Sequence, residues 1–297
     1  MSFDILQKRI DELRNPTVVG LDPTLKLVPP HMLDSAHGTA LSFFEYGTQL
    51  IDALCDIVPA VKPQAAYYET LGPVGFEILR DTMDYAKSKG MYVILDAKRG
   101  DIGSTAEAYA AAYLGSDSKY TVDALTINSY LGSDGIVPFY KTACDNDKAV
   151  FVLLKTSNPS SGELQDLEVV SDIKVGSKKA YMAIAEIIKK MAAGSEGEFG
   201  YTRLGAVVGA TYPEELGILR GALKNTFFLV PGYGAQGGGA ADVAGAFDKQ
   251  GKGAVVNSSR AIIGAWQKTG RDGHDYLEAA RNEALKMRDD LRRELGL

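Results

Sequence analysis

Short apolar runs alternate with helical patterns along this 297-residue chain, and this alternation constrains the fold more than any other feature. Candidate strands lie at 17–21, 57–62, 91–95, 122–127, 149–154, 203–208, 226–230 and 253–257. Several of them are apolar at nearly every position, which is typical of strands covered on both faces. Helical patterns separate them at 40–56, 73–89, 103–114, 133–143, 177–193, 213–223, 239–249 and 259–267.

Eight alternating strand and helix units in roughly 250 residues predict an α/β fold, a (β/α)8 TIM barrel, with an open doubly wound sheet as the alternative. The segment 1–15 places apolar residues on one helical face and predicts an extra N-terminal helix. The stretch 270–297 predicts an exposed, charged C-terminal helix. No linker or composition shift divides residues 1–297, so we expect a single domain. The long connection 157–176 has a length that is often found in lids.

Charge and cysteine content exclude several classes of protein. The net charge of −6 gives no basic footprint for nucleic acid or an anionic membrane. No apolar run is long enough for a membrane span or a signal peptide. Cys55 and Cys144 lack metal-ligand or redox spacing, which favours free thiols in a reducing cytoplasm. The histidines lie in predicted loops or near the end of the chain and indicate no metal site.

Charged residues follow the predicted strands where barrel enzymes carry their chemistry, at the carboxyl ends. In the stretch LDAKRGDIGSTAEAYA (95–110), strand periodicity puts Asp96 and Lys98 on one side, and Asp101 lies in the following turn. Lys62 from the neighbouring strand completes an alternating set of charges. A solvated strand end is the alternative, but the position beside other charged strand ends favours catalysis.

The charge pattern also indicates a type of chemistry. A lysine between two aspartates is held protonated, which suits a proton donor and not a Schiff-base nucleophile. A carboxylate beside the substrate could repel a substrate carboxylate and so favour its loss.

Two glycine- and serine-rich stretches predict a phosphate site. PGYGAQGGG (231–239) formally contains G-x-G-x-x-G, but it lies late in the chain and the next strand ends in Asn257 instead of an acid, so a dinucleotide site is weakly supported. Paired with NSSRA (257–261), it fits the phosphate-binding loops after strands seven and eight of barrels. Backbone N–H groups there, with Gln236 and Arg260, could bind phosphate oxygens. Plain turn glycines are the alternative.

The strand ending KTSNP (155–159) offers hydroxyl and amide groups to a polar heterocycle or a sugar. These groups belong to Thr156, Ser157 and Asn158, and turn chemistry before Pro159 explains them nearly as well.

Taken in order, the motifs VGLDP, VKPQ, LDAKRGDIGST, TSNP, VPGYGAQGGG and NSSRAI resemble the orotidine 5′-phosphate decarboxylase family, most closely its longer bacterial-type subgroup. The resemblance spans residues 15 to 267, and it implies a carboxy-lyase that converts orotidine monophosphate to uridine monophosphate. This reaction is the last step of de novo pyrimidine synthesis, and the resemblance implies that it uses neither a cofactor nor a metal.

The resemblance also implies roles for individual residues. Lys62, Asp96, Lys98 and Asp101 would form a charged tetrad. In it, Lys98 would protonate C6 of the pyrimidine, and Asp96 would face the departing carboxylate. Asp22 and Lys62 would hold the ribose hydroxyls.

The remaining implied contacts concern the base, the phosphate and a second subunit. Ser157 would touch the pyrimidine, with Thr156 or Asn158 able to share that role. The phosphate contacts would come from Gln236, Gly237, Ser259 and Arg260. Asp101 and Thr105 are similar to residues that enter the partner subunit's site, which implies a homodimer.

Three alternatives stay open. Mg²⁺-dependent sugar-phosphate decarboxylases and synthases share D-x-K-x-x-D, but they carry a carboxylate where this chain has Lys62. A Schiff-base aldolase shares the architecture. A barrel that only binds a phosphorylated ligand would leave the charged tetrad unexplained.

Overall fold

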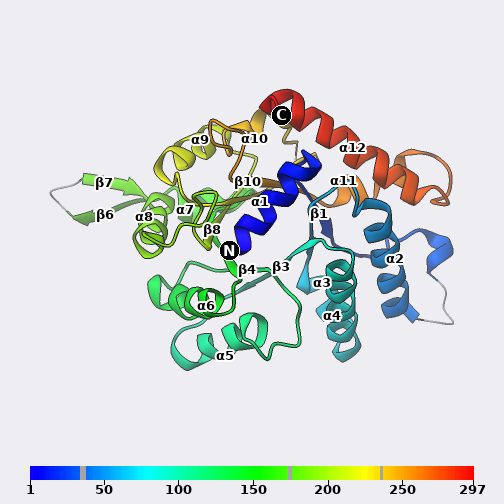
Figure 1. Cartoon of the computed structure of the whole chain (residues 1–297), viewed down its shortest axis with the longest axis horizontal. Coiled ribbons are helices and arrows are strands. Elements are labelled where there is room, and N and C mark those ends of the chain that lie inside the picture. Colours follow the sequence, from blue (N-terminus) through cyan, green and yellow to red (C-terminus); the bar gives the residue numbers. More distant parts are fainter. Residues whose placement is uncertain (34–37, 173–175, 235–236) are drawn as a thin grey trace.

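A computed structural model describes residues 1–33, 38–172, 176–234 and 237–297. Within these ranges the parallel strands follow the order β1-β10-β9-β8-β5-β4-β3-β2 (Figure 1). Because β1 pairs with both β2 and β10, the sheet closes on itself. The predicted barrel is therefore confirmed, and the open doubly wound sheet is wrong.

The barrel strands lie where the sequence predicts them, with ends shifted by a few residues. They are β1 (Thr17–Leu21), β2 (Ala60–Pro63), β3 (Tyr92–Arg99), β4 (Ala124–Ile127), β5 (Ala149–Lys155), β8 (Leu204–Val208), β9 (Phe228–Pro231) and β10 (Ala254–Ser258).

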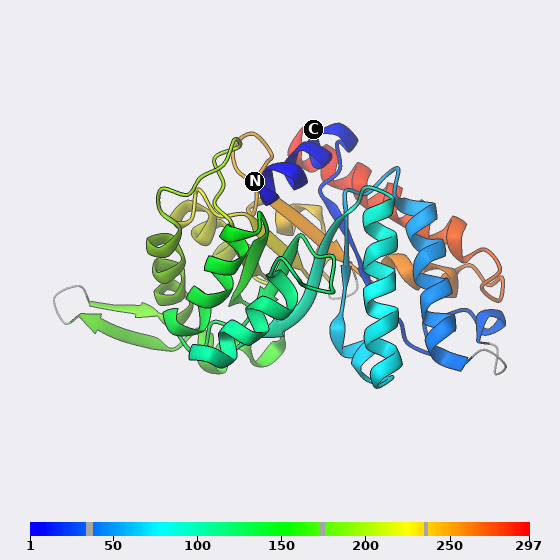
Figure 2. The same ribbon diagram turned by 60° about the horizontal axis from the view of Figure 1, so that its bottom comes forward.

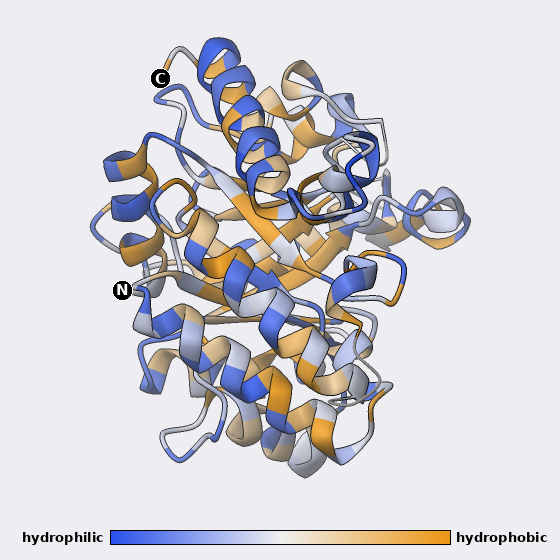
Figure 3. Cartoon of the chain, turned by 90° about the vertical axis from the view of Figure 1, so that its right-hand side faces the viewer, coloured by the Kyte–Doolittle hydropathy of each residue, from blue (hydrophilic) through white to orange (hydrophobic). Residues whose placement is uncertain are grey.

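Helices surround the barrel and pack apolar side chains against it. The hydropathy colouring shows apolar strands in the middle and helices of mixed polarity around them (Figure 3). They are α1 (Ser2–Leu13), α2 (Gly38–Leu54), α3 (Ala65–Glu69), α4 (Pro73–Ser88), α5 (Gly103–Leu114), α6 (Ser133–Asp145), α7 (Gly162–Gln165), α8 (Ala180–Ala192), α9 (Pro213–Ala222), α10 (Ala240–Ala244), α11 (Arg260–Ile263) and α12 (Tyr276–Leu295). Single turns of 3-10 helix lie at η1 (Pro30–Met32), η2 (Pro159–Ser161) and η3 (Ala265–Lys268). Among the residues described, no helix combines the length and apolar character needed to cross a lipid bilayer.

Alternation along the strands separates two cores. Val19 and Leu21 of β1 pack outward against the helices, whereas Val18 points into the barrel. The predicted N-terminal helix, α1, packs against this inner core at the end of the barrel where the strands begin. Its Phe3 ring lies 4.9 Å from both the Phe151 and the Phe227 ring centroids. The opposite end of the barrel is left for polar side chains.

The segment after β5 differs from the sequence prediction. Its residues form η2, α7 and an antiparallel hairpin of β6 (Glu168–Asp172) and β7 (Gly176–Lys179) that projects away from the barrel (Figures 1 and 2). The helix predicted from 177 begins only at Ala180, because residues 176–179 pair with β6 and leave no backbone groups for a helix. The helix predicted at 239–249 is also shorter, ending at Ala244, and the short α3 was missed.

Candidate active site

A cavity of about 870 Å³ opens at the carboxyl ends of the barrel strands. Its walls come from residues that are far apart in the sequence but adjacent at this end of the barrel. The polar residues that line it include Asp22, Lys62, Gln64, Asp96, Lys98, Thr126, Asn128, Thr156, Ser157, Asn158, Gln165, Asn257, Ser259 and Arg260. This is the end of the barrel where enzymes of this architecture carry their active sites.

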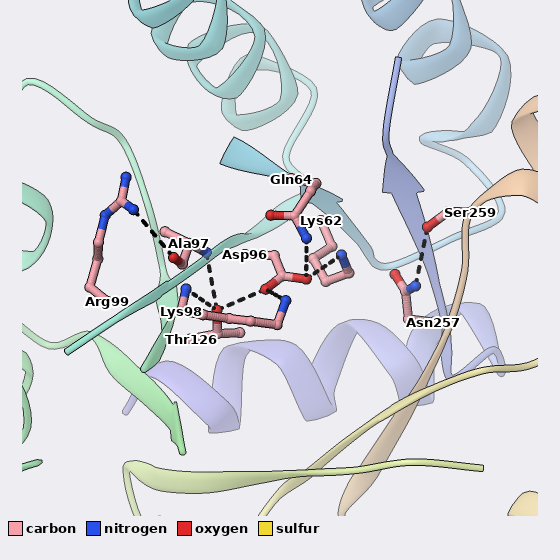
Figure 4. Close-up of polar contacts among 9 residues, drawn as sticks. All are labelled: Lys62, Gln64, Asp96, Ala97, Lys98, Arg99, Thr126, Asn257 and Ser259. Atoms are coloured by element: carbon pink, nitrogen blue, oxygen red, sulfur yellow. Dashed lines mark hydrogen bonds and ion pairs between the residues drawn. The ribbon is translucent and has the colours of Figure 1, made fainter. Parts of the chain in front are cut away.

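The Asp96 carboxylate is the centre of the polar network in the cavity (Figure 4). Its Oδ2 lies 2.8 Å from Lys62 Nζ and accepts a hydrogen bond of 3.1 Å from Gln64 Nε2. Its Oδ1 lies 2.6 Å from Lys98 Nζ and accepts a 2.9 Å hydrogen bond from Thr126 Oγ1. One buried carboxylate therefore joins two lysines, as the alternating charge pattern predicts.

Electrostatics keep the buried Asp96 carboxylate and the Lys62 ammonium charged. Burial alone raises the pKa of Asp96, but the cations of Lys62 and Lys98 outweigh it and hold that pKa well below its usual range. Burial alone lowers the pKa of Lys62, but the carboxylates of Asp96 and Asp22 outweigh it and leave that pKa raised. Since Lys98 Nζ is also paired with Asp96, the cavity presents a fixed carboxylate beside an ammonium group.

Lys98 occupies an unusual backbone conformation for a strand residue, with φ 49°. Left-handed backbone at a residue other than glycine is uncommon and often marks a functional site. The Thr126 hydroxyl oxygen accepts hydrogen bonds from the backbone N–H groups of Ala97 (3.1 Å) and Lys98 (3.0 Å). These contacts from β4 fix the turn that aims the Lys98 side chain at the cavity.

Asp101 and Thr105 do not line the cavity of their own chain. The Asp101 carboxylate accepts a 2.8 Å hydrogen bond from the backbone N–H of Ile102, just before α5, and Thr105 lies exposed on that helix. Within one chain the structure thus brings together Lys62, Asp96 and Lys98 but not the fourth member of the predicted tetrad. A role for Asp101 and Thr105 in a partner's site stays a prediction.

The predicted phosphate residues are only partly assembled in the described chain. Ser259 and Arg260 line the cavity at the start of α11. Gly20 of β1 leaves room for the Ser259 side chain, because a Cβ at position 20 would lie 1.7 Å from Ser259 Oγ. Gln236 lies outside the described residues, and Gly237 is described but does not line the cavity.

The three residues after β5 lie on the cavity wall, but their side chains differ in their bonding. Thr156 Oγ1 donates a 2.6 Å hydrogen bond to Asn158 Oδ1, so these two side chains hold each other. Within the described part of the chain, the Ser157 hydroxyl makes no hydrogen bond and borders the cavity. Gly209 permits this approach, since a Cβ there would come within 2.8 Å of Ser157 Cβ.

A family model described as "Orotidine 5'-phosphate decarboxylase / HUMPS family" matches residues 16–270 of the chain. The chain belongs to this family.

Curated relatives and a solved structure agree with this assignment. The chain is 44% identical over 290 residues to the orotidine 5′-phosphate decarboxylase of Rhodopirellula baltica, covering 93% of this chain and 94% of that protein. It is 39% identical over 291 residues to the enzyme of the same name from Clostridium kluyveri, covering 98% and 97%. The structure of Leishmania donovani OMP decarboxylase is similar with a TM-score of 0.72 at 31% identity, covering 97% of this chain and 98% of that one.

Several cavity residues of this family member were not predicted as site residues from the sequence. Gln64 follows Lys62 by two positions, so strand alternation could have identified it. Thr126 and Asn257 lie in strands on the inner face, and the same alternation applies, but neither carries a charge that would draw notice. Asn257 Oδ1 is buried and has no hydrogen-bond partner in the described residues.

Arg99, which the sequence left without a role, points away from the cavity. Its guanidinium pairs with Glu69 and lies 5.6 Å from the Tyr113 ring centroid, joining α3 to α5 outside the barrel.

The described residues include no group of three or more His, Cys, Asp or Glu side chains that could hold a metal ion.

Proposed function

We propose that this chain decarboxylates orotidine 5′-phosphate to uridine 5′-phosphate, with Lys98 as the proton donor to C6 of the pyrimidine. Family membership supports decarboxylation, and curated relatives carry the name of this reaction's enzyme. The observation that carries the finer proposal is the buried Asp96 carboxylate, which lies 2.6 Å from Lys98 Nζ inside the cavity.

At the reacting atoms, the proposed step uses Asp96 and Lys98 of the chain that holds the cavity. Asp96 is held ionised, so a substrate carboxylate placed beside it is destabilised by like-charge repulsion. The bond between C6 and the carboxylate breaks, CO₂ leaves, and the electron pair stays on C6. The Lys98 ammonium stabilises this carbanion and transfers one proton to C6, which leaves uridine 5′-phosphate and a neutral lysine that is reprotonated from solvent.

The other cavity residues would bind the rest of the nucleotide. Asp22 Oδ1 is buried without a hydrogen-bond partner in the described residues, which suits an acceptor for a ribose hydroxyl that Lys62 also contacts. We assign the pyrimidine contact to Ser157, because Thr156 and Asn158 engage each other.

At the other end of the nucleotide, we propose that the phosphate is bound by Ser259 and Arg260, with Gln236 and Gly237 completing the site. A phosphate contact far from C6 supplies binding energy that helps to close the site around the reacting ring.

We further propose that the enzyme works as a homodimer. Asp101 and Thr105 lie outside their own cavity, which agrees with a contribution to the partner's site.

We also propose that the protein is located in the cytoplasm. The free thiols of Cys55 and Cys144 fit a reducing compartment.

The Mg²⁺-dependent sugar-phosphate enzymes are the second candidate, because they share the D-x-K-x-x-D motif. In this chain Lys62 Nζ occupies one oxygen of Asp96 and Lys98 Nζ the other, so a cation at this carboxylate would have to displace an ammonium group. Positive charge at Lys62 opposes metal binding there.

Turnover of orotidine 5′-phosphate, followed by the change in pyrimidine absorbance with and without EDTA, tests the proposal. We expect turnover that the chelator does not change. Absence of turnover would refute the proposed function, and loss of turnover with EDTA would favour the Mg²⁺-dependent relatives. Lys98→Ala should abolish the reaction, whereas Lys179→Ala, at an exposed lysine of the hairpin, should leave it unchanged.

A further inference from the structure

The segment from Thr156 to Asp166 forms one wall of the cavity. Thr156, Ser157, Asn158, Leu164 and Gln165 all line it. Its central part, η2 and α7, contains only short helical turns, which by themselves cannot hold a loop in one conformation. The described structure instead closes the loop at its base with two side-chain contacts.

The first contact is made by Gln165. Its Oε1 accepts a 3.0 Å hydrogen bond from the backbone N–H of Thr156, and its Nε2 donates a 2.7 Å hydrogen bond to Thr156 Oγ1. One side-chain amide thus binds both the backbone N–H and the side-chain hydroxyl of a residue nine positions earlier. Thr156 Oγ1 in turn donates a 2.6 Å hydrogen bond to Asn158 Oδ1, so Gln165 also restrains Asn158 indirectly.

The second contact is an ion pair directly behind the first. Lys155 Nζ lies 2.9 Å from both Asp166 Oδ1 and Oδ2, and the lysine side chain is 0% exposed. The same ammonium lies 4.3 Å from the Tyr212 ring centroid. Tyr212 in turn shares a 3.0 Å hydrogen bond with Ser161 of the loop.

Burying a lysine completely is expensive unless its charge is paired, and a buried pair is better at fixing one geometry than at adding stability. Lys155 does not line the cavity, so it cannot contact a bound nucleotide directly. Its pairing with Asp166 joins the residue just before this loop to the last residue of the loop. The arrangement therefore fits residues that position others.

We propose that Gln165 and the Lys155–Asp166 pair are positioning residues that hold the base-binding segment 156–158 in place before the nucleotide arrives. The inference deepens the proposed function and rests on its assignment of Ser157 to the pyrimidine. Its consequence is selective. Loss of either contact should weaken recognition of the base and leave recognition of the ribose phosphate intact, because the proposed phosphate residues Ser259 and Arg260 lie at the start of α11, away from this loop in the chain.

Calorimetric titration of Gln165→Ala and Lys155→Met with UMP and with ribose 5-phosphate, which lacks the base, tests this selectivity. We expect the Kd for UMP to rise about tenfold in each variant, as the loss of one or two hydrogen bonds predicts. The Kd for ribose 5-phosphate should stay unchanged. In turnover of orotidine 5′-phosphate, KM should rise more than kcat falls.

Matched variants separate positioning from general damage. Glu163→Ala lies on the same short helix as Gln165 but is exposed, and Lys179→Met removes a half-exposed cation 3.8 Å from the same Asp166 carboxylate. Both should leave UMP binding unchanged. Lys155→Arg keeps the charge and should restore most of the affinity that Lys155→Met loses. Because Gln165 is not fully buried, its variant tests the proposal even where Lys155→Met fails to fold.

The inference is overturned if both ligands weaken equally, or if UMP affinity does not change in Gln165→Ala. It is upheld if UMP binding alone is lost, even in a chain that does not turn over orotidine 5′-phosphate, in which case the proposed function fails by itself. A wild-type chain that binds no UMP would overturn both.

Discussion

The Thr126 hydroxyl connects three parts of the site through one oxygen atom. It donates to Asp96 Oδ1 and accepts from the backbone N–H groups of Ala97 and Lys98. Thr126 is 1% exposed, so its hydroxyl makes these hydrogen bonds away from solvent. This neutral residue thereby positions both the Asp96 carboxylate and the backbone of Lys98, the proposed proton donor.

We expect Thr126→Val, which keeps the shape and removes the hydroxyl, to lower kcat about tenfold or more, because Lys98 and Asp96 lose their common support. Steady-state kinetics with orotidine 5′-phosphate measure the effect. Thr126→Ser retains the hydroxyl and should keep kcat close to wild type. An unchanged kcat in Thr126→Val would mean that the hydrogen bonds of this hydroxyl do not support the reaction.

The opposite pKa shifts of Asp96 and Lys62 predict how stability depends on pH. The folded pKa of Asp96 is depressed, so its ionisation stabilises the fold fully above the ordinary value of about 4 and loses this effect as the pH falls. The folded pKa of Lys62 is raised, so its contribution is complete below about 10.4 and is lost as the pH rises through the folded value.

The Tm difference between wild type and Asp96→Asn should therefore be largest above about pH 5 and shrink as the pH falls below about 4. Thermal unfolding over a pH series measures it. Ile5→Ala, which removes no titratable group, should show no such trend. A constant Tm difference across the acid range would contradict the assignment of charge to buried Asp96.

At the scale of elements, α1 closes the end of the barrel opposite the cavity. Phe3 is 1% exposed and packs on the rings of Phe151 and Phe227, and Ser2 Oγ shares a 2.7 Å hydrogen bond with Tyr92 OH of β3. The helix thus fills the inner core that the strands leave open. Because it lies away from the cavity, it should affect stability more than chemistry.

Phe3→Ala should destabilise the fold by about 3–5 kcal/mol and leave kcat nearly unchanged, because it opens a cavity in the inner core. Denaturant unfolding and turnover assays test both halves of this statement. Ile5→Ala on the same helix removes a side chain that is 46% exposed, and it should cost less than about 1 kcal/mol. Similar losses from the two variants would mean that α1 does not plug the barrel.

At the scale of the whole molecule, we propose that each site is completed by two chains. Lys98 lines its own cavity, whereas Asp101, just before α5, does not. If Asp101 serves the partner's site, a dimer of two differently inactivated chains holds one site with both native residues. Sedimentation measurements of the purified chain should accordingly show a dimer.

Mixing equal amounts of inactive Lys98→Ala and Asp101→Ala chains should restore about a quarter of wild-type activity, since half of the dimers form with one intact site of two. Turnover after subunit exchange gives the readout. Lys98→Ala mixed with Lys62→Ala should restore nothing, because each change inactivates the cavity of the chain that carries it. Failure of the first mixture to recover activity after demonstrated exchange would remove Asp101 from the partner's site.

Part of this fold and site could be predicted because it depends on local periodicity. Alternating apolar runs and helical patterns indicate the barrel, and a period of two places Asp96 and Lys98 on one face. Other parts escaped prediction because they depend on pairing. The sequence predicts a loop and the start of a helix where β6 and β7 form a hairpin, since these short strands carry charged residues and no long apolar run.

The sequence by itself determined the strand and helix order, the charged strand ends and the family motifs, because each is encoded within a few consecutive residues. Only the tertiary structure decided that Thr126 supports Lys98, that Gln165 holds Thr156 and that Arg99 faces away from the cavity. These contacts depend on the register between neighbouring strands and on how a loop returns to its own base. No local period fixes either, because both are set by packing between residues far apart in the chain.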